Sequence, residues 1–196
     1  MNIRIAALGL ALIALPVLAQ KYATDKGGSE RSMALSTLER GKRMKGSRDE
    51  YRHLTQVLAV PRANSSETPE QAIARVEKGA QLVETKGRFV LFRSAQSRSA
   101  PLAPDAGLFP TAVNSRTGAL GIITGTVIVR PRSMSDADAI ASDHGLVKAR
   151  AYPQLNTVFY RAAPGVDIAD LAAALQSDPR VESAYPEIIE YMRVPK

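Results

Sequence analysis

The sequence contains no cysteine and no tryptophan, and aromatic residues make up 5% of the chain. Without cysteine, the protein can form neither a disulfide nor a thiolate metal site, and it has no cysteine nucleophile. Its core must therefore be built mainly from alanine, valine, isoleucine and leucine. The chain also lacks a G-x-S-x-G nucleophile elbow and a G-x-x-x-x-G-K-S/T phosphate loop, which removes two common kinds of catalytic site.

Long hydrophobic runs are also scarce, and the longest lies at the N-terminus. A single early charge, Arg4, precedes an apolar stretch over residues 5–18, and Val17 and Ala19 stand where signal peptidase needs small residues. The pattern predicts a signal peptide over residues 1–19 and a mature chain that is exported, either periplasmic or secreted. No later stretch approaches the roughly 18 apolar residues of a membrane-spanning helix, so we expect no transmembrane segment after cleavage.

Positive charge is concentrated in the first part of the mature chain. Residues 20–62 hold ten Lys or Arg against five Asp or Glu, whereas residues 124–196 hold eight against nine. The stretch LERGKRMKGSR at residues 38–48 can meet phosphates or anionic lipid. It has no interleaved aromatic residues, and export argues against a nucleic-acid partner. We therefore interpret residues 20–62 as a basic, partly disordered arm and expect no binding of nucleic acid.

A helix is predicted over residues 68–87. Thr68 can cap it, Pro69 suits its first turn, and Gln71 stands at the capping-box position. Apolar residues then recur at helical spacing up to Gly87, which is expected to end the helix. They are Ile73, Val76, Ala80 and Val83.

Shorter elements surround that helix. Leu54, Val57 and Leu58 recur at helical spacing and predict a short helix over residues 49–60. Residues 88–94 alternate like a strand, residues 94–110 are rich in proline and small residues, and residues 114–118 can turn one strand back on the next. Residues 63–123 are accordingly interpreted as a small α/β N-terminal domain.

Residues 124–187 show the most regular pattern in the chain. Strands are predicted over residues 124–132, 146–153, 156–162 and 181–187, and helices over residues 133–145 and 165–179. Ser135 is expected to cap the first helix, with Asp138 three residues later, and Gly145 to end it. The apolar stripes of the two helices are Ala137, Ile140, Ala141 and His144, and Ile168, Leu171, Ala172 and Leu175.

This order predicts an α+β protein with a C-terminal split β-α-β, ferredoxin-like antiparallel sheet and two helices on one face, preceded by a small helix-plus-strands region. The other face of the sheet would have no helical cover. There, Ile128 and Phe159 are expected to form an apolar patch beside the basic residues Arg130 and Arg161. Such a patch fits either a protein partner or contact with the chain's own middle region.

Residues 124–196 resemble the propeptide domains of subtilisin-like serine proteases and their stand-alone inhibitor relatives. The short Asp-rich helix followed by GLVKARAYP carries this resemblance, as does LQSDPRVESAYPE, in which a helix ends at Asp-Pro and a strand leads into a tail. A protease domain follows in ordinary precursors, whereas this sequence stops at Lys196. It is therefore similar in particular to the external chaperones of secreted subtilisin-like, or kexin-like, proteases.

The resemblance implies an external chaperone and inhibitor of a subtilisin-like serine protease. The sheet face would dock on the protease through Ile128, Arg130, Phe159 and Arg161. The extended tail over residues 188–196 would enter the active-site cleft as an added strand. The implied tail residues are Ile188, Ile189, Glu190, Tyr191, Met192, Arg193, Val194, Pro195 and Lys196. A frayed terminus is the alternative reading of the tail.

No group of side chains predicts catalysis. His53 and His144 lie far apart in the sequence, and His144 ends an apolar stripe, so we interpret it as a packed or capping side chain rather than a metal ligand. We expect no enzymatic activity, no cofactor and no metal. The alternative to a protease chaperone is a non-catalytic exported structural or interaction domain, or a degenerate zymogen remnant without a partner.

Overall fold

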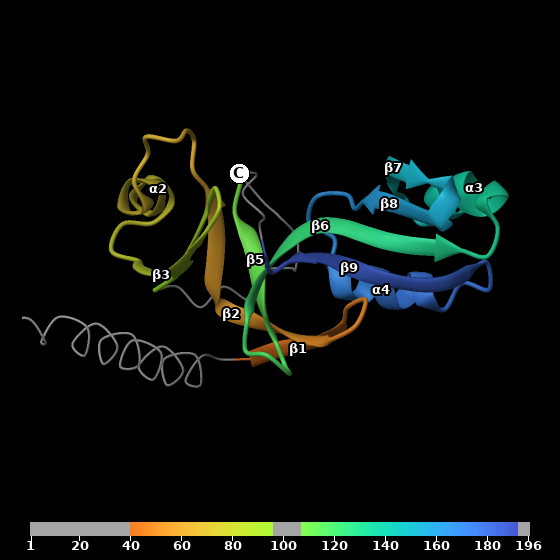
Figure 1. Ribbon diagram of the computed structural model, residues 1–196, viewed down its shortest axis with the longest axis horizontal. Coiled ribbons are helices and arrows are strands. Elements are labelled where there is room, and N and C mark those ends of the chain that lie inside the picture. The colour runs from red at the N-terminus through yellow and green to blue at the C-terminus, as the bar shows by residue number, and fades with distance from the viewer. Residues whose placement is uncertain (1–39, 96–106, 192–196) are drawn as a thin grey trace, which may run out of the picture. The chain divides into compact units, whose positions relative to one another are not determined.

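The computed structural model describes residues 40–95 and 107–191 (Figure 1). The predicted signal peptide, residues 20–39 of the predicted arm, most of the proline-rich loop and the last five residues of the predicted tail lie outside the described residues. Among the helices that are described, none is long and apolar enough to cross a membrane.

The described residues form three α-helices and nine strands, which confirms the α+β class. Every strand pair among them is antiparallel. The strands are β1 (Arg40–Lys45), β2 (Glu50–Pro61), β3 (Gln81–Lys86), β4 (Phe89–Arg93), β5 (Phe109–Asn114), β6 (Leu120–Pro131), β7 (Val147–Tyr152), β8 (Thr157–Arg161) and β9 (Val181–Ile189). The helices are α2 (Pro69–Val76), α3 (Ala137–Asp143) and α4 (Ile168–Gln176).

Strand β6 joins the two halves of one continuous sheet. The strands lie in the order β3-β4-β2-β5-β6-β8-β7, with β1 beside β2 and β9 beside β6. Residues 120–122 of β6 pair with β5, and residues 126–129 pair with β8. Strand β9 runs along the other edge of β6. The sheet therefore continues across the domain boundary that the sequence placed after residue 123.

Helices α3 and α4 cover the same face of strands β6, β8 and β9 (Figure 1). Val127 and Val129 of β6 are fully buried in one core with Ile140 of α3 and Leu175 of α4. The stripe predicted for the second helix is buried throughout its four residues. Burial alternates along β6 because successive side chains of a strand point to opposite faces. The remaining side chains of this part of β6 lie on the opposite face, which α2, α3 and α4, the α-helices of the described residues, leave uncovered.

The first helix of this region starts differently from its prediction. Ser133 caps a 3₁₀ turn ahead of the helix, where its hydroxyl accepts a hydrogen bond from the Ser135 amide at 3.4 Å, and the cap position of α3 itself is Asp136 rather than Ser135. Ser133 has extended backbone angles that suit a cap, and a short 3₁₀ turn over Met134–Asp136 precedes α3. Gly145 follows the helix with φ of 62°, in the left-handed conformation predicted for it.

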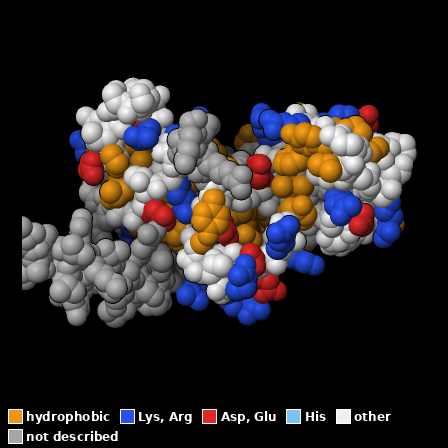
Figure 2. Space-filling model, in the orientation of Figure 1, with side chains coloured by type: hydrophobic (Ala, Val, Ile, Leu, Met, Phe, Trp, Pro, Cys, Tyr) orange, Lys and Arg blue, Asp and Glu red, His pale blue; other side chains and the backbone are white. Residues whose placement is uncertain are grey.

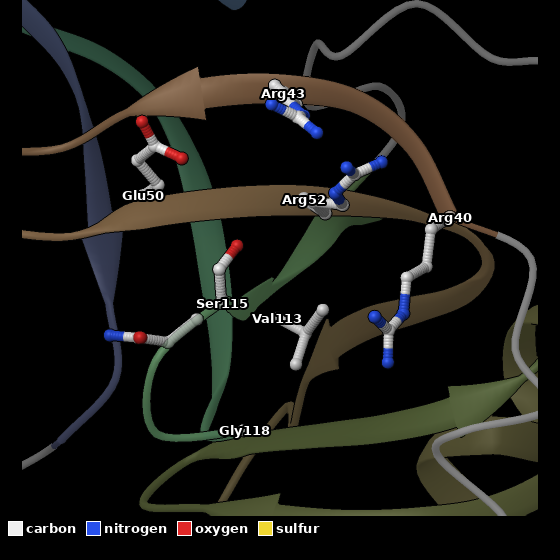
Figure 3. A pocket seen from close by; sticks show the side chains of 8 residues that line it. Arg40, Arg43, Glu50, Arg52, Val113, Ser115 and Gly118 are labelled. Carbon is white, nitrogen blue, oxygen red and sulfur yellow. The ribbon is translucent and has the colours of Figure 1, made fainter.

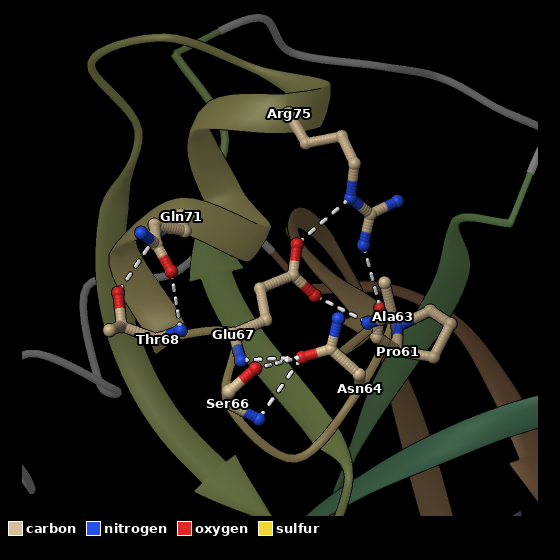
Figure 4. A network of polar contacts seen from close by, with 8 residues as sticks. All are labelled: Pro61, Ala63, Asn64, Ser66, Glu67, Thr68, Gln71 and Arg75. Atoms are coloured by element: carbon tan, nitrogen blue, oxygen red, sulfur yellow. Dashed lines mark hydrogen bonds and ion pairs between the residues drawn. The ribbon is translucent and has the colours of Figure 1, made fainter.

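Helix α2 begins as predicted and ends early. Thr68 and Gln71 form the predicted capping box, with hydrogen bonds of 3.2 and 2.9 Å (Figure 4). Arg75, near the end of the helix, donates hydrogen bonds to the Glu67 carboxylate at 3.1 Å and to the carbonyl of Pro61, the last residue of β2, at 2.8 Å (Figure 4). The helix stops at residue 76, so the prediction that it runs to Gly87 is wrong.

Residues 77–87 instead make a turn and strand β3. Gly79 and Gly87 both have positive φ, 82° and 56°, and they reverse the chain before and after this strand. Glycine adopts this conformation at little cost. Val83 and Ala80 therefore recur at helical spacing in the sequence without belonging to a helix.

The helix predicted over residues 49–60 is also wrong, since this segment is strand β2. Strand β2 pairs with β1, β4 and β5, and residues 57–60 are buried without a break. A strand covered on both faces loses the alternation that identifies strands in a sequence. Residues 40–45 of the predicted basic arm form β1 on the edge of β2, where Met44 alone is buried.

A compact ion cluster closes the turn between α4 and β9. Arg180 donates two hydrogen bonds to Asp178, at 3.0 and 2.7 Å, and contacts Asp143 at 2.8 Å. His144 Nε2 lies 3.1 Å from Asp178, so its predicted role as a packed or capping side chain fits its position. The Asp178 side chain is only 6% exposed. The pKa of Asp178 lies below its usual value, mainly because Arg180 donates hydrogen bonds to the carboxylate. The hydrogen bond with His144 lowers it further.

Replacing Asp178 with Asn is expected to reduce the free energy of unfolding by about 1.5–3 kcal/mol at pH 7, the range for hydrogen bonds to charged groups. Because the folded-state pKa is depressed, this contribution is present above the unfolded pKa of about 3.9 and is lost as pH falls further. Urea unfolding at several pH values should show the two proteins converging below about pH 4.

The matched control is Asp138→Asn on α3. The Asp138 side chain is 83% exposed and pairs with Lys148, so the loss should stay below about 1 kcal/mol. Equal losses for the two variants, or a difference at Asp178 that does not change with pH, would contradict this account.

Candidate functional site

The sheet face opposite α3 and α4 presents a row of side chains from four neighbouring strands. Tyr185 of β9 pairs with Ile128 of β6, which pairs with Phe159 of β8, which in turn pairs with Arg150 of β7. Residues in such register lie about 4.5–5.5 Å apart and point to the same side. The first three are half-buried, although no described helix packs over them. We call this row, together with Tyr152, the open face.

Aromatic contacts hold the open face in shape. The rings of Tyr152 and Phe159 meet edge to face, with centroids 5.7 Å apart. Arg150 donates a hydrogen bond of 3.1 Å to the Tyr152 hydroxyl. Figure 2 shows hydrophobic side chains gathered over β6 and its neighbours, with basic and acidic side chains around them. An apolar centre with a charged rim is the usual composition of a protein-binding surface.

The predicted face residues lie together on this surface. Ile128 and Phe159 are cross-strand partners, and the exposed side chains of Arg130 and Arg161 come from the same two strands. The positive charge of Arg130 is offset only weakly, by the Glu182 carboxylate at 3.9 Å. The sequence reasoning missed Tyr185, Tyr152 and Arg150. Tyr185 stands between Ala184 and Pro186, which are buried on the helix-covered face. Side-chain alternation along the strand could therefore have assigned Tyr185 to the open face.

The predicted tail begins inside the sheet. Ile188 and Ile189 belong to β9 and pair with Ile123 and Ile122 of β6. Glu190 follows directly, and Tyr191 is 76% exposed. Residues 192–196, namely Met192, Arg193, Val194, Pro195 and Lys196, lie outside the described residues. The paired part of the tail is therefore fixed by main-chain hydrogen bonds up to residue 189.

Glu190 is held by side chains from the first half of the chain. Lys86, at the end of β3, donates a hydrogen bond of 2.9 Å to the Glu190 carbonyl. Asn114, at the end of β5, donates one of 2.7 Å to the Glu190 carboxylate. Burial, followed by a hydrogen bond with Glu190, raises the pKa of Tyr51 above its usual value. We call Lys86, Asn114 and Tyr51 the anchor of the C-terminal strand.

Asn114 is positioned for this contact by its own turn. The whole residue is only 1% exposed. The side-chain oxygen accepts the amides of Arg116 and Thr117 at 2.9 and 3.1 Å, and the amide nitrogen also bonds Asp49 at 3.1 Å. Arg116 binds the same carboxylate and lowers the pKa of Asp49. Because the turn amides occupy the side-chain oxygen of Asn114, its NH₂ group points to the carboxylates of Asp49 and Glu190.

Gly121 of β6 leaves room for the end of β9. A Cβ atom added at this position would lie 2.4 Å from Ile188 Cγ2, which is too close for any real contact. Ile188 itself packs against the core shared by α3 and α4. Backbone and side chain therefore fit together tightly at the point where the C-terminal strand reaches the anchor.

No group of described residues has the composition of a metal site. His53 is buried, and that burial lowers its pKa. His144 is committed to Asp178. The arrangement on the open face and at the anchor is suited to binding another protein, and it offers no nucleophile paired with a base.

Comparison with known proteins adds a family. The family described as the open reading frame 2 N-terminal domain matches residues 39–195. Among curated proteins, none matches the chain. One similar solved structure is the crystal structure of the Aeromonas sobria serine protease in complex with the chaperone ORF2. The match has 21% sequence identity, covers 45% of this chain and 92% of the other, and has a TM-score of 0.37.

Replacing Gly121 with Ala is expected to cost about 1–3 kcal/mol of unfolding free energy, the usual range for overpacking. The same replacement in an Ile188→Ala background should cost much less, because the clashing methyl group is gone. A double-mutant cycle measured by urea unfolding gives the coupling energy between the two positions. Equal costs in both backgrounds would show that Gly121 does not support the end of β9.

Proposed function

Because the chain belongs to the open reading frame 2 N-terminal domain family, we propose that it is a non-catalytic, exported chaperone and inhibitor of a subtilisin-like serine protease. The observation that carries the proposal is the open face, where Tyr185, Ile128 and Phe159 lie in one cross-strand row that none of the described helices covers. The resemblance of residues 124–196 to subtilisin propeptides gives this face a partner, since propeptides dock on their protease by a sheet.

In this proposal the open face binds the folding protease and the tail binds its active-site cleft. An extended segment adds to a cleft by main-chain hydrogen bonds, while alternate side chains enter its pockets. The end of β9 is already extended and held by the anchor. The five residues after Tyr191 would then continue outward as the inhibitory segment, with the basic side chains of Arg193 and Lys196 suited to a kexin-like cleft.

A preformed sheet can also speed the folding of a large protease. Folds dominated by contacts between distant residues lose chain entropy before those contacts form, so they fold slowly. A surface that binds two elements of the protease early lowers that barrier. The same contacts persist in the folded complex, which explains why one protein would act both as chaperone and as inhibitor.

The open face is tested by the double variant Ile128→Thr, Phe159→Thr. Threonine suits a strand, and both side chains are only half-buried, so the fold should be retained. Loss of two central apolar contacts should weaken inhibition of a subtilisin-like protease by about thirtyfold or more. The yield of active protease on refolding should fall with it.

The control is Leu155→Thr, which removes an exposed apolar side chain, 61% exposed, from the loop between β7 and β8. It should leave both activities unchanged. If the double variant folds and still inhibits and refolds the protease like the parent protein, the open face is not the docking surface.

The tail is tested by ending the chain after Tyr191. This truncation keeps Ile188 and Ile189, whose pairing with β6 a deletion from residue 188 would destroy. Inhibition should weaken by at least about tenfold, because main-chain hydrogen bonds in the cleft are lost. Refolding of the protease should be affected less, since the open face remains. Unchanged inhibition would refute insertion of the tail.

A further inference from the structure

A basic cleft lies among the N-terminal strands; its lining includes no residue of the open face, and it shares Asn114 with the anchor. It has a volume of about 240 Å³ and lies where β1, β2 and the turn after β5 meet (Figure 3). Its lining residues are Arg40, Arg43, Glu50, Arg52, Val113, Asn114, Ser115 and Gly118. Three cations and one carboxylate line the cleft, so its charge is strongly positive for its size.

A bulge in β1 brings Arg40 and Arg43 to the same cleft. Residues three apart on a regular strand point to opposite faces. Here Arg40 pairs with Leu54 and Arg43 with Arg52, so three steps along β1 match two along β2. The extra residue turns Arg40 to the side of Arg43, as bulges near functional sites often do.

Arg43 and Arg52 are direct cross-strand partners. Like charges in this position repel each other and destabilise a sheet. Val113 pairs with Arg52 from the other side and contributes an apolar wall rather than a compensating charge. Glu50, the acidic lining residue, is itself paired in register with Lys45.

The three guanidinium groups have no carboxylate partner within the part of the chain that the structure describes. Other arginines of the same protein do have one: Arg75 binds Glu67, Arg116 binds Asp49 and Arg180 binds Asp178. Among the described residues this repelling pair has no compensating carboxylate, and an anion supplied from outside would provide the missing charge.

We propose that this cleft binds a phosphate group, either free or as a monoester. The planar guanidinium group matches the oxygens of phosphate with two parallel hydrogen bonds. The dianion would offset the excess charge of the cleft, and the Ser115 hydroxyl adds a neutral donor at its rim. Binding would also relieve the repulsion between Arg43 and Arg52. This site does not depend on the protease-directed function proposed above.

The test is thermal unfolding of the full mature chain with inorganic phosphate, compared with chloride at equal ionic strength. Phosphate should raise Tm saturably, by about 2–4 °C at concentrations well above Kd. The variants Arg43→Gln and Arg52→Gln should each bind at least about tenfold more weakly. Without phosphate, both should be at least as stable as the parent protein, because the repulsive pair is broken.

Lys78→Gln is the matched control, because Lys78 is exposed, lies outside the cleft and carries the same charge. It should keep the full response to phosphate. The proposal is overturned if phosphate acts no differently from chloride, or if Arg52→Gln keeps the parent response, or if Lys78→Gln loses as much of it.

Sedimentation with vesicles distinguishes the source of the phosphate group. Phosphatidylcholine vesicles with and without phosphatidic acid are compared. Binding to phosphatidic acid that is lost in Arg43→Gln and Arg52→Gln would support a lipid headgroup as the ligand. A Tm response to phosphate without vesicle binding would support a soluble phosphate. Vesicle binding that both arginine variants retain would count against the cleft.

Discussion

The whole described structure depends on the pairing of β6 with three other strands. Its first residues complete the N-terminal sheet through β5, its last residues pair with β8, and β9 lies along its other edge. Because β6 is paired along both edges, few of its backbone N–H and C=O groups need hydrogen-bond partners outside the sheet. It also makes β6 the element that fixes the open face, through Ile128, relative to the end of the C-terminal strand, through Gly121.

The two faces of β6 have different roles because the described helices cover only one of them. Val127 and Val129 are fully buried beneath α3 and α4 and contribute to folding. Ile128, between them, is only half-buried, so part of its apolar surface stays accessible. A partner that covered it would bury the area that intramolecular packing leaves exposed.

Sequence patterns predicted elements that have one buried face and failed for those with two or none. The stripe through Ile168 and Leu175 identified α4, and alternation around Ile128 identified β6. Strand β2 was taken for a helix because residues 57–60 are buried on both faces of the sheet and so lack the alternation of a half-exposed strand. Strand β1 was taken for an arm because an edge strand can carry charge at almost every position. The anchor could not be predicted at all, since Lys86, Asn114 and Glu190 meet only in the folded chain.

The anchor gives the first half of the chain a role in the proposed function. A tail that moved freely would reach the cleft of a docked protease at an effective concentration set by its flexibility. Lys86 and Asn114 instead hold Glu190 at the edge of the same sheet that bears the open face. Part of the ordering entropy is then lost when the chaperone itself folds, not when it binds. Strands β3 to β5 would therefore strengthen inhibition without contacting the protease.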